Sequence, residues 1–136
     1  MAAGETLHPY IEFKDVSKAF GDREILKNVS FEVLPGEMVC ILGRSGVGKS
    51  VSLHSIMGFL KPDSGRVIVA AQDITDYDEV QLEEIRKKVT MVFQNGALFD
   101  SLTVGENVAF PLREKRELSE EQIYQVVDGL LEMVGV

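Results

Sequence analysis

The segment GRSGVGKS at residues 43–50 constrains the fold of this chain more than any other part of the sequence. It fits the pattern of a glycine, four variable residues, Gly-Lys, and then a serine or threonine. An apolar run at residues 38–42 comes directly before it, and a stretch with helical character at residues 51–60 follows it. We therefore expect a buried strand, a glycine-rich loop and a helix in direct succession, an arrangement that binds phosphate groups.

The predicted loop offers groups that suit a nucleoside triphosphate. Gly43, Gly46 and Gly48 allow successive backbone N–H groups to point inward and form a concave site for anions. Lys49 is expected to reach the β- and γ-phosphates, and Ser50 to offer its hydroxyl to Mg²⁺. The other side chains matter less, because the backbone holds the phosphates. The predicted nucleotide-binding residues of this segment are Gly43, Arg44, Ser45, Gly46, Val47, Gly48, Lys49, Ser50 and Val51.

Composition excludes several classes of protein. The 136 residues carry a formal net charge of −8, which argues against nucleic acid as a partner. The longest uninterrupted apolar runs, at residues 38–42 and 67–71, are far shorter than the roughly 20 residues that cross a bilayer, so no transmembrane segment is expected. Residues 1–9 lack the features of a secretory signal and are expected to be flexible. Cys40 is expected to be a small buried residue. These features favour the cytosol.

Residue patterns predict further elements and an α/β fold. Alternation predicts strands at residues 10–16 and 28–33 around a turn at residues 20–24. Residues 66–70 are a third strand candidate, and residues 38–42 and 89–93 are expected to be buried strands. Capping boxes predict two helices, from Asp78 with Gln81 through residue 88, and from Ser119 with Gln122 through residue 134. In the last helix residues 123, 127, 130, 131 and 134 share an apolar face, and Gly135 suits its C-terminal cap.

The sequence before the loop resembles the front of ATP-binding-cassette (ABC) ATPases. The resemblance rests on VSKAFG at residues 16–21, LKNVSF at residues 26–31, and Gly36-Glu37. In that family an aromatic residue upstream of the loop stacks on adenine, and Phe20 falls at that position. Base–aromatic stacking contributes about 1–3 kcal/mol and tolerates different bases. The alternative for Phe20 is an aromatic residue packed in the core of a hairpin.

The segment VFQ at residues 92–94 resembles the Q-loop of the same family. The resemblance implies that Gln94 contacts Mg²⁺ and the attacking water and senses a membrane partner, a role that suits an amide because it both donates and accepts. The alternative is an ordinary polar residue at the end of a strand. Lys49 and Gln94 are thus the candidate catalytic residues, and Ser50 and Gln94 the candidate metal ligands.

Residues 95–108 (NGALFDSLTVGENV) are similar to the corresponding stretch of the Mce-linked phospholipid transporter ATPases, which maintain outer-membrane lipid asymmetry in bacteria with two membranes. Residues 46–51 (GVGKSV) and 110–114 (FPLRE) favour the same subfamily. The wider resemblance begins at residue 10. It implies a β subdomain and P-loop core over residues 10–94, followed by the Q-loop and the start of the helical subdomain over residues 94–136, where the chain is expected to be truncated.

Three motifs of the full ATPase do not occur after Gln94: a signature such as LSGGQ, a Walker B strand that ends in Asp-Glu, and a switch histidine. Asp100 is followed by Ser101 rather than by a catalytic glutamate. Because no carboxylate is in place to polarise the attacking water, hydrolysis by these residues alone is expected to be negligible. The core strands are also expected to lack a neighbour on one edge.

The resemblance implies the N-terminal part of an ABC transporter ATPase subunit that binds ATP with Mg²⁺. It implies a membrane permease and a second copy of the subunit as partners, at the cytoplasmic face of the inner membrane. A non-hydrolysing nucleotide-binding or regulatory module is the main alternative. A cassette protein of DNA repair or translation, and another P-loop class such as a small kinase or GTPase, are further ones. The absence of an N-K-x-D segment counts against a GTPase.

Overall fold

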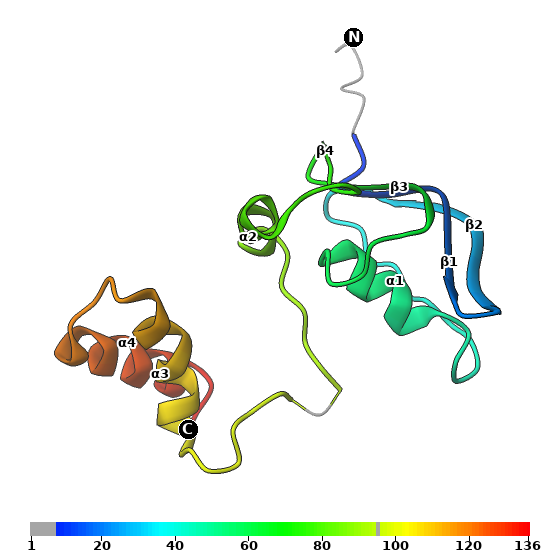
Figure 1. The fold of residues 1–136 in the computed structure, drawn as a ribbon. Coiled ribbons are helices and arrows are strands. Elements are labelled where there is room, and N and C mark those ends of the chain that lie inside the picture. The colour runs from blue at the N-terminus through cyan, green and yellow to red at the C-terminus, as the bar shows by residue number, and fades with distance from the viewer. Residues whose placement is uncertain (1–7, 95) are drawn as a thin grey trace, which may run out of the picture. The chain divides into compact units, whose positions relative to one another are not determined.

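The computed structural model describes residues 8–94 and 96–136. Most of the N-terminal segment that was predicted to be flexible lies outside these residues. The chain forms two compact units, residues 1–91 and residues 92–136, and each is described by itself. The elements of the first unit are β1 (Ile11–Phe20), β2 (Arg23–Val33), α1 (Lys49–Ile56), β3 (Ser64–Val69), β4 (Gln72–Asp73) and α2 (Glu79–Arg86), and those of the second are α3 (Val104–Lys115) and α4 (Glu120–Met133) (Figure 1).

The first unit is built on a four-stranded antiparallel sheet with the strand order β2-β1-β3-β4. Gly21, at a φ of 59°, forms the tight turn between β1 and β2, so the predicted turn is confirmed. Both strands are longer than predicted and contain bulges. At one bulge Asp15 has a φ of 49°, and its N–H donates to the hydroxyl of Ser30 at 2.9 Å. The bulges keep the strands paired where the simple alternation of the sequence breaks.

The core of this unit lies between the sheet and helices α1 and α2. The sheet contributes Phe13 and Val67, and the helices contribute Ile56, Leu82 and Ile85. α1 contacts both β2 and β3. The N-cap Asp78 and Gln81 form the predicted capping box, so the start of α2 is confirmed.

The end of α1 turns sharply so that it can pack on α2. Gly58 has a φ of 69°, and a Cβ atom there would lie 2.3 Å from the Leu82 side chain. The Arg86 side chain donates from Nε to the Met57 carbonyl at 3.2 Å and lies over the Phe59 ring at 4.8 Å. A glycine is therefore required where the two helices meet.

The two predicted buried strands at residues 38–42 and 89–93 are not strands, and this part of the prediction was wrong. Met38 is 96% exposed, Leu42 86% and Val92 89%. Cys40 is likewise exposed rather than buried. A strand forms by pairing its backbone groups with a neighbour, and the described sheet ends at β2 and β4 without reaching either segment. These segments therefore belong to no helix or strand, and the α/β class rests on the antiparallel sheet and the helices.

The second unit packs α3 against α4. Ala109 on α3 and Ile123 and Val127 on α4 are buried, and Val108, Leu112 and Leu131 pack around them. Ser119 and Gln122 form the predicted capping box at the start of α4, and Gly135 has a φ of 78° beyond its end. The predicted apolar face is only partly buried, because Leu130 and Val134 are exposed. α3 was not predicted as a helix, although Thr103 and Glu106 form the same kind of capping box.

Side-chain bonds hold the connections of this unit. The Asn107 amide donates to the Phe99 and Leu102 carbonyls at 3.1 and 3.2 Å, and its oxygen accepts the Phe99 N–H at 2.8 Å. Arg113 binds the Glu120 carboxylate with two nitrogens, from Nε at 3.0 Å and from Nη2 at 2.8 Å. This pairing lowers the pKa of Glu120 from its ordinary value. Among the described residues, no helix is both long enough and apolar enough to cross a membrane.

Candidate functional site

The glycine-rich segment forms a loop that leads directly into α1. Gly46 and Gly48 have φ values of 79° and 103°, a backbone conformation that residues with a Cβ atom rarely adopt. α1 begins at Lys49, and its N-cap Gly48 provides no side-chain hydrogen bond to the helix. The first N–H groups of any helix lack partners within the helix, and at α1 no capping side chain accepts a hydrogen bond from them. The loop therefore presents free backbone donors at the positive end of the helix dipole, where an anion is favoured.

The Lys49 side chain crosses the loop. Its ammonium donates to the Gly43 carbonyl and to the Arg44 carbonyl, both at 2.7 Å. These bonds join the start of the loop to the first residue of α1 and place a positive charge inside the loop. The arrangement positions Lys49 as the countercharge for a phosphate that the loop holds.

Two glycines of the loop lie close to neighbouring side chains, and Gly48 is the more constrained of them, because Leu26 is buried whereas Val47 is exposed. A Cβ atom at Gly43 would lie 2.7 Å from Cγ2 of Val47. A Cβ atom at Gly48 would lie 2.7 Å from Cδ2 of Leu26 and 3.2 Å from Cγ2 of Ile25. Gly48 is buried, so the loop rests directly on the first part of β2. No local signal in the sequence predicts this support, because the contact joins Ile25 and Leu26 to a glycine more than twenty residues later.

The remaining predicted loop residues fall into two groups. Arg44, Ser45 and Ser50 are exposed, whereas Val51 packs against the core, so that only its backbone can serve a ligand. Ser50 is the second residue of α1, and its hydroxyl makes no hydrogen bond among the residues that the structure describes. By contrast, the hydroxyl of Ser55 donates to the carbonyl four residues earlier, at 2.9 Å. The Ser50 hydroxyl is therefore free to contact a ligand or metal.

Phe20 lies at the end of β1 and is 49% exposed, so it is not the core aromatic of the alternative interpretation. Lys18 and Asp63 hold the strand beside it. The Lys18 ammonium contacts Oδ1 of Asp63 at 2.7 Å and lies 5.8 Å from the Phe20 ring centroid, while Oδ2 of Asp63 accepts the Ala19 N–H at 2.7 Å. The hydrogen bond from Lys18 and the one from Ala19 lower the pKa of Asp63. The ring is thus held at the surface, as a stacking platform requires.

Gln94 lies in an exposed turn of the second unit. Ser50, the other predicted magnesium ligand, belongs to the first unit, and the role of Gln94 stays a prediction. Within the described residues no cluster of three or more His, Cys, Asp or Glu side chains could hold a metal ion by itself. A magnesium ion that uses one serine hydroxyl needs phosphate oxygens and water to complete its six ligands.

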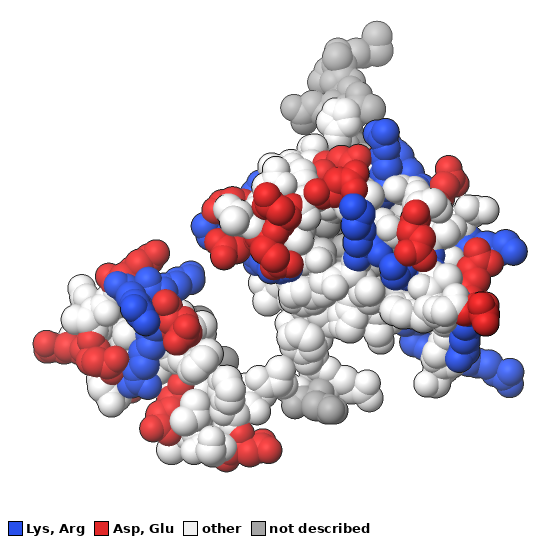
Figure 2. Space-filling model, in the orientation of Figure 1, with Lys and Arg blue, Asp and Glu red and all other residues white. Residues whose placement is uncertain are grey.

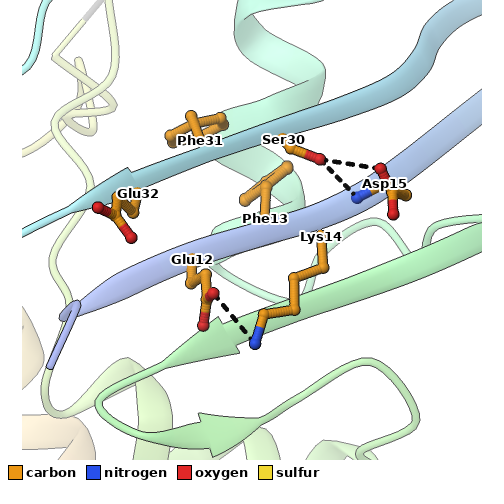
Figure 3. Close-up of a pocket in the computed structure, with 7 residues that line it drawn as sticks. All are labelled: Glu12, Phe13, Lys14, Asp15, Ser30, Phe31 and Glu32. Atoms are coloured by element: carbon orange, nitrogen blue, oxygen red, sulfur yellow. Dashed lines mark hydrogen bonds and ion pairs between the residues drawn. The ribbon is translucent and has the colours of Figure 1, made fainter.

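A separate open hollow of about 370 Å³ lies on the β1–β2 hairpin (Figure 3). Glu12, Phe13 and Lys14 of β1 line it together with Phe31 and Glu32 of β2. The rings of Phe13 and Phe31 stack at 4.5 Å, and Lys14 pairs with Glu12 at 3.0 Å. None of its lining residues belongs to the phosphate loop, and its carboxylates disfavour a triphosphate. Figure 2 shows acidic and basic side chains interspersed over the visible face, without one broad basic patch.

The comparisons with known proteins decide the family. The family model described as ABC transporter matches residues 26–135. This chain belongs to the ABC transporter family. The ATPases of the family hydrolyse ATP with Mg²⁺ and couple the reaction to transport. The family resemblance of the sequence is thereby confirmed.

Three relatives show how far the likeness extends. The chain is 41% identical over 126 residues to the intermembrane phospholipid transport system ATP-binding protein MlaF of Haemophilus influenzae, covering 93% of this chain and 48% of MlaF. It is 44% identical over 127 residues to the chloroplastic protein TRIGALACTOSYLDIACYLGLYCEROL 3 of Arabidopsis thaliana, covering 93% of this chain and 36% of that protein. It is 38% identical over 131 residues to the methionine import ATP-binding protein MetN of Brucella abortus, covering 96% and 35%.

Solved structures of ABC proteins are also similar to this chain. The dimeric post-hydrolysis structure of the ATP-binding cassette MJ0796, bound to ADP and Pi, matches with a TM-score of 0.77 and 35% identity over 90% of this chain and 56% of that one. The cbiO1 protein of Clostridium perfringens matches with a TM-score of 0.78 and 30% identity, covering 94% and 51%. The chain thus spans between about a third and a half of the curated relatives described here.

Proposed function

We propose that this chain is the ATP-binding part of an ABC transporter ATPase subunit, which binds ATP with Mg²⁺ to power transport through a membrane permease. The observation that carries the proposal is the phosphate loop. Uncapped N–H groups, two glycines at positive φ and the Lys49 ammonium converge on one short segment at the start of α1. That combination of free backbone donors and one cation suits a phosphate group.

Each predicted site residue receives a role in this proposal. The Phe20 ring stacks on adenine, and the backbone of the loop from Gly43 to Gly48 holds the phosphates. Lys49 exchanges its bonds with two loop carbonyls for bonds with phosphate oxygens, which are stronger acceptors because they are charged. Ser50 and Gln94 supply oxygen ligands for Mg²⁺, whose bound charge would offset that of the phosphates. The Ser50 hydroxyl fits this role because it has no other partner among the described residues.

The transported substrate is proposed to be a lipid. Two observations support this choice: the relative MlaF carries phospholipid transport in its name, and residues 95–108 are similar to the Mce-linked group. The similarity to a methionine importer shows that the likeness alone does not select one substrate. The proposed partners are a membrane permease and a second copy of the subunit, at the cytoplasmic face of the inner membrane. The proposed division of the domain is a β subdomain and P-loop core over residues 10–94 and the start of the helical subdomain over residues 94–136.

Replacement of Lys49 tests the proposal. Lys49→Ala is expected to weaken ATP binding by about tenfold or more, since hydrogen bonds from a charged donor contribute about 1.5–3 kcal/mol. Isothermal titration calorimetry of the 136-residue chain with Mg-ATP measures the change. Lys61→Ala is the control, because it removes an equally charged side chain that pairs with Asp76 at the surface. Unchanged affinity in Lys49→Ala, or an equal loss in Lys61→Ala, would overturn the assignment.

A non-hydrolysing nucleotide-binding module is the second candidate. The segment from Gln94 to Val136 contains no LSGGQ-like signature and no Asp-Glu pair. Phosphate release under saturating Mg-ATP tests whether these residues hydrolyse the nucleotide by themselves. Binding without turnover is expected here, because the carboxylate that would polarise the attacking water is not in this segment. Appreciable turnover would show that a catalytic carboxylate lies elsewhere in the chain.

A further inference from the structure

Arg23 connects the two parts of the proposed nucleotide site. It is the first residue of β2, and its Cα atom pairs with that of Phe20 across the hairpin. The side chain extends from there to the phosphate loop, where Nη2 lies 3.7 Å from the place that a Cβ atom of Gly46 would occupy. Figure 1 shows the turn between β1 and β2 next to the loop that precedes α1. One cation therefore links the aromatic platform with the loop.

The charge of Arg23 is not used by the fold. Within residues 8–94 and 96–136 no carboxylate forms an ion pair with it, and no hydrogen bond from its guanidinium is present. The acidic residue that follows it, Glu24, pairs with Lys27 at 3.5 Å instead. The other arginines of the first unit, by contrast, have acidic partners or are part of the loop itself, as Arg66 with Asp73 illustrates at 3.7 Å. All the donors of the Arg23 guanidinium are therefore free for an external acceptor.

We propose that Arg23 is a further nucleotide-binding residue that contacts the phosphate chain of ATP beside Gly46. The inference rests on the proposed function, and it adds a residue that neither the loop motif nor the family resemblance assigned. A guanidinium suits the position because its planar fork can bind two phosphate oxygens together, which an ammonium cannot do in the same way. Lys49 acts from the helix side of the loop and Arg23 from the hairpin side. The two cations thus approach the polyphosphate from different directions.

The test compares Arg23→Gln and Arg23→Lys with the matched control Arg66→Gln. Arg66 is also an exposed arginine of the sheet, but it lies on β3 and pairs with Asp73. Arg23→Gln is expected to weaken Mg-ATP binding in calorimetry by about tenfold, as for the loss of a charge-assisted contact. Arg23→Lys should recover part of the affinity, and Arg66→Gln should bind as the unaltered chain does. Circular dichroism and the unfolding midpoint check that each variant keeps its fold.

Inorganic tripolyphosphate, which has no base, identifies the part of the nucleotide that Arg23 contacts. A similar loss for tripolyphosphate and ATP, which becomes smaller in high salt, is the result expected for a phosphate contact. A loss for ATP alone would overturn the proposal, because Arg23 would then act only on the base platform. Unchanged ATP binding in Arg23→Gln, with binding lost in Lys49→Ala, would overturn this inference and leave the proposed function standing. No ATP binding by the unaltered chain would overturn both.

Discussion

Substitution of Gly48 tests whether contact with β2 holds the phosphate loop in shape. Gly48 has a φ of 103°, and an added Cβ atom would lie 2.7 Å from Cδ2 of Leu26 and 3.3 Å from the carbonyl oxygen of Ile25. Leu26 is only 4% exposed, so its side chain has little room to withdraw. The carbonyl belongs to the backbone of β2, so it cannot rotate away from the added atom as the end of a side chain can. The Gly48→Ala variant must therefore shift the loop away from β2.

The cost follows from two effects. Forcing a residue with a side chain into the left-handed region costs roughly 1–2 kcal/mol. Inserting a methyl group into a well-packed core costs about 1–3 kcal/mol. The sum, about 2–5 kcal/mol, is a large part of the roughly 5–15 kcal/mol that stabilises a typical folded domain. If the loop moves and the core stays packed, the substitution distorts the phosphate-binding geometry and weakens ATP binding instead of lowering stability.

Urea unfolding followed by far-ultraviolet circular dichroism measures the free energy of unfolding. Calorimetry with Mg-ATP measures the affinity of the loop for the nucleotide. Gly36→Ala is the matched control, because Gly36 also has a positive φ, 77°, but has nothing within 4 Å of an added Cβ. The control should show the backbone cost alone. Gly48→Ala should show the additional packing cost, a weaker affinity, or both. Equal effects of the two substitutions on stability and on ATP binding would refute the claim that β2 supports the loop.

Two further predictions concern the hairpin end that carries the aromatic ring. Phe20→Ala is expected to weaken ATP binding by about 1–3 kcal/mol of stacking while leaving the unfolding midpoint nearly unchanged; Phe59→Ala, at the same 49% exposure, should leave the affinity unaltered. The lowered pKa of Asp63 means that its bonds to Lys18 and Ala19 stabilise the fold above the ordinary Asp value of 3.8 and are lost as pH falls through the folded-state pKa. Unfolding midpoints of the unaltered chain and Asp63→Asn should therefore differ at neutral pH and converge in acid. A difference that persists below the folded-state pKa would contradict the stabilising role of the Asp63 carboxylate.

Local signals in the sequence were sufficient for several elements. The capping boxes at Asp78 and Ser119 marked the starts of α2 and α4, because a cap satisfies donors within a few residues of itself and needs no distant partner. Thr103 and Glu106 carry the same signal for α3, so this helix too is predictable from local sequence. The short turn after Phe20 makes Phe20 and Arg23 cross-strand partners. The sequence therefore places Arg23 beside the predicted adenine platform, although its approach to the phosphate loop is seen only in the structure.

The failed strand predictions show what apolar composition does and does not determine. Residues 38–42 and 89–93 are as hydrophobic as buried strands, yet Met38 and Val92 are almost fully exposed, because burial and pairing depend on neighbours far along a chain. The phosphate loop nevertheless has its shape, although the segment before it is unpaired. Lys49 joins α1 to the start of the loop, and Gly48 packs on β2. The loop is therefore held from the helix and the hairpin rather than from the segment before it, and substitutions at the β2 contact should disturb it more than substitutions within residues 38–42.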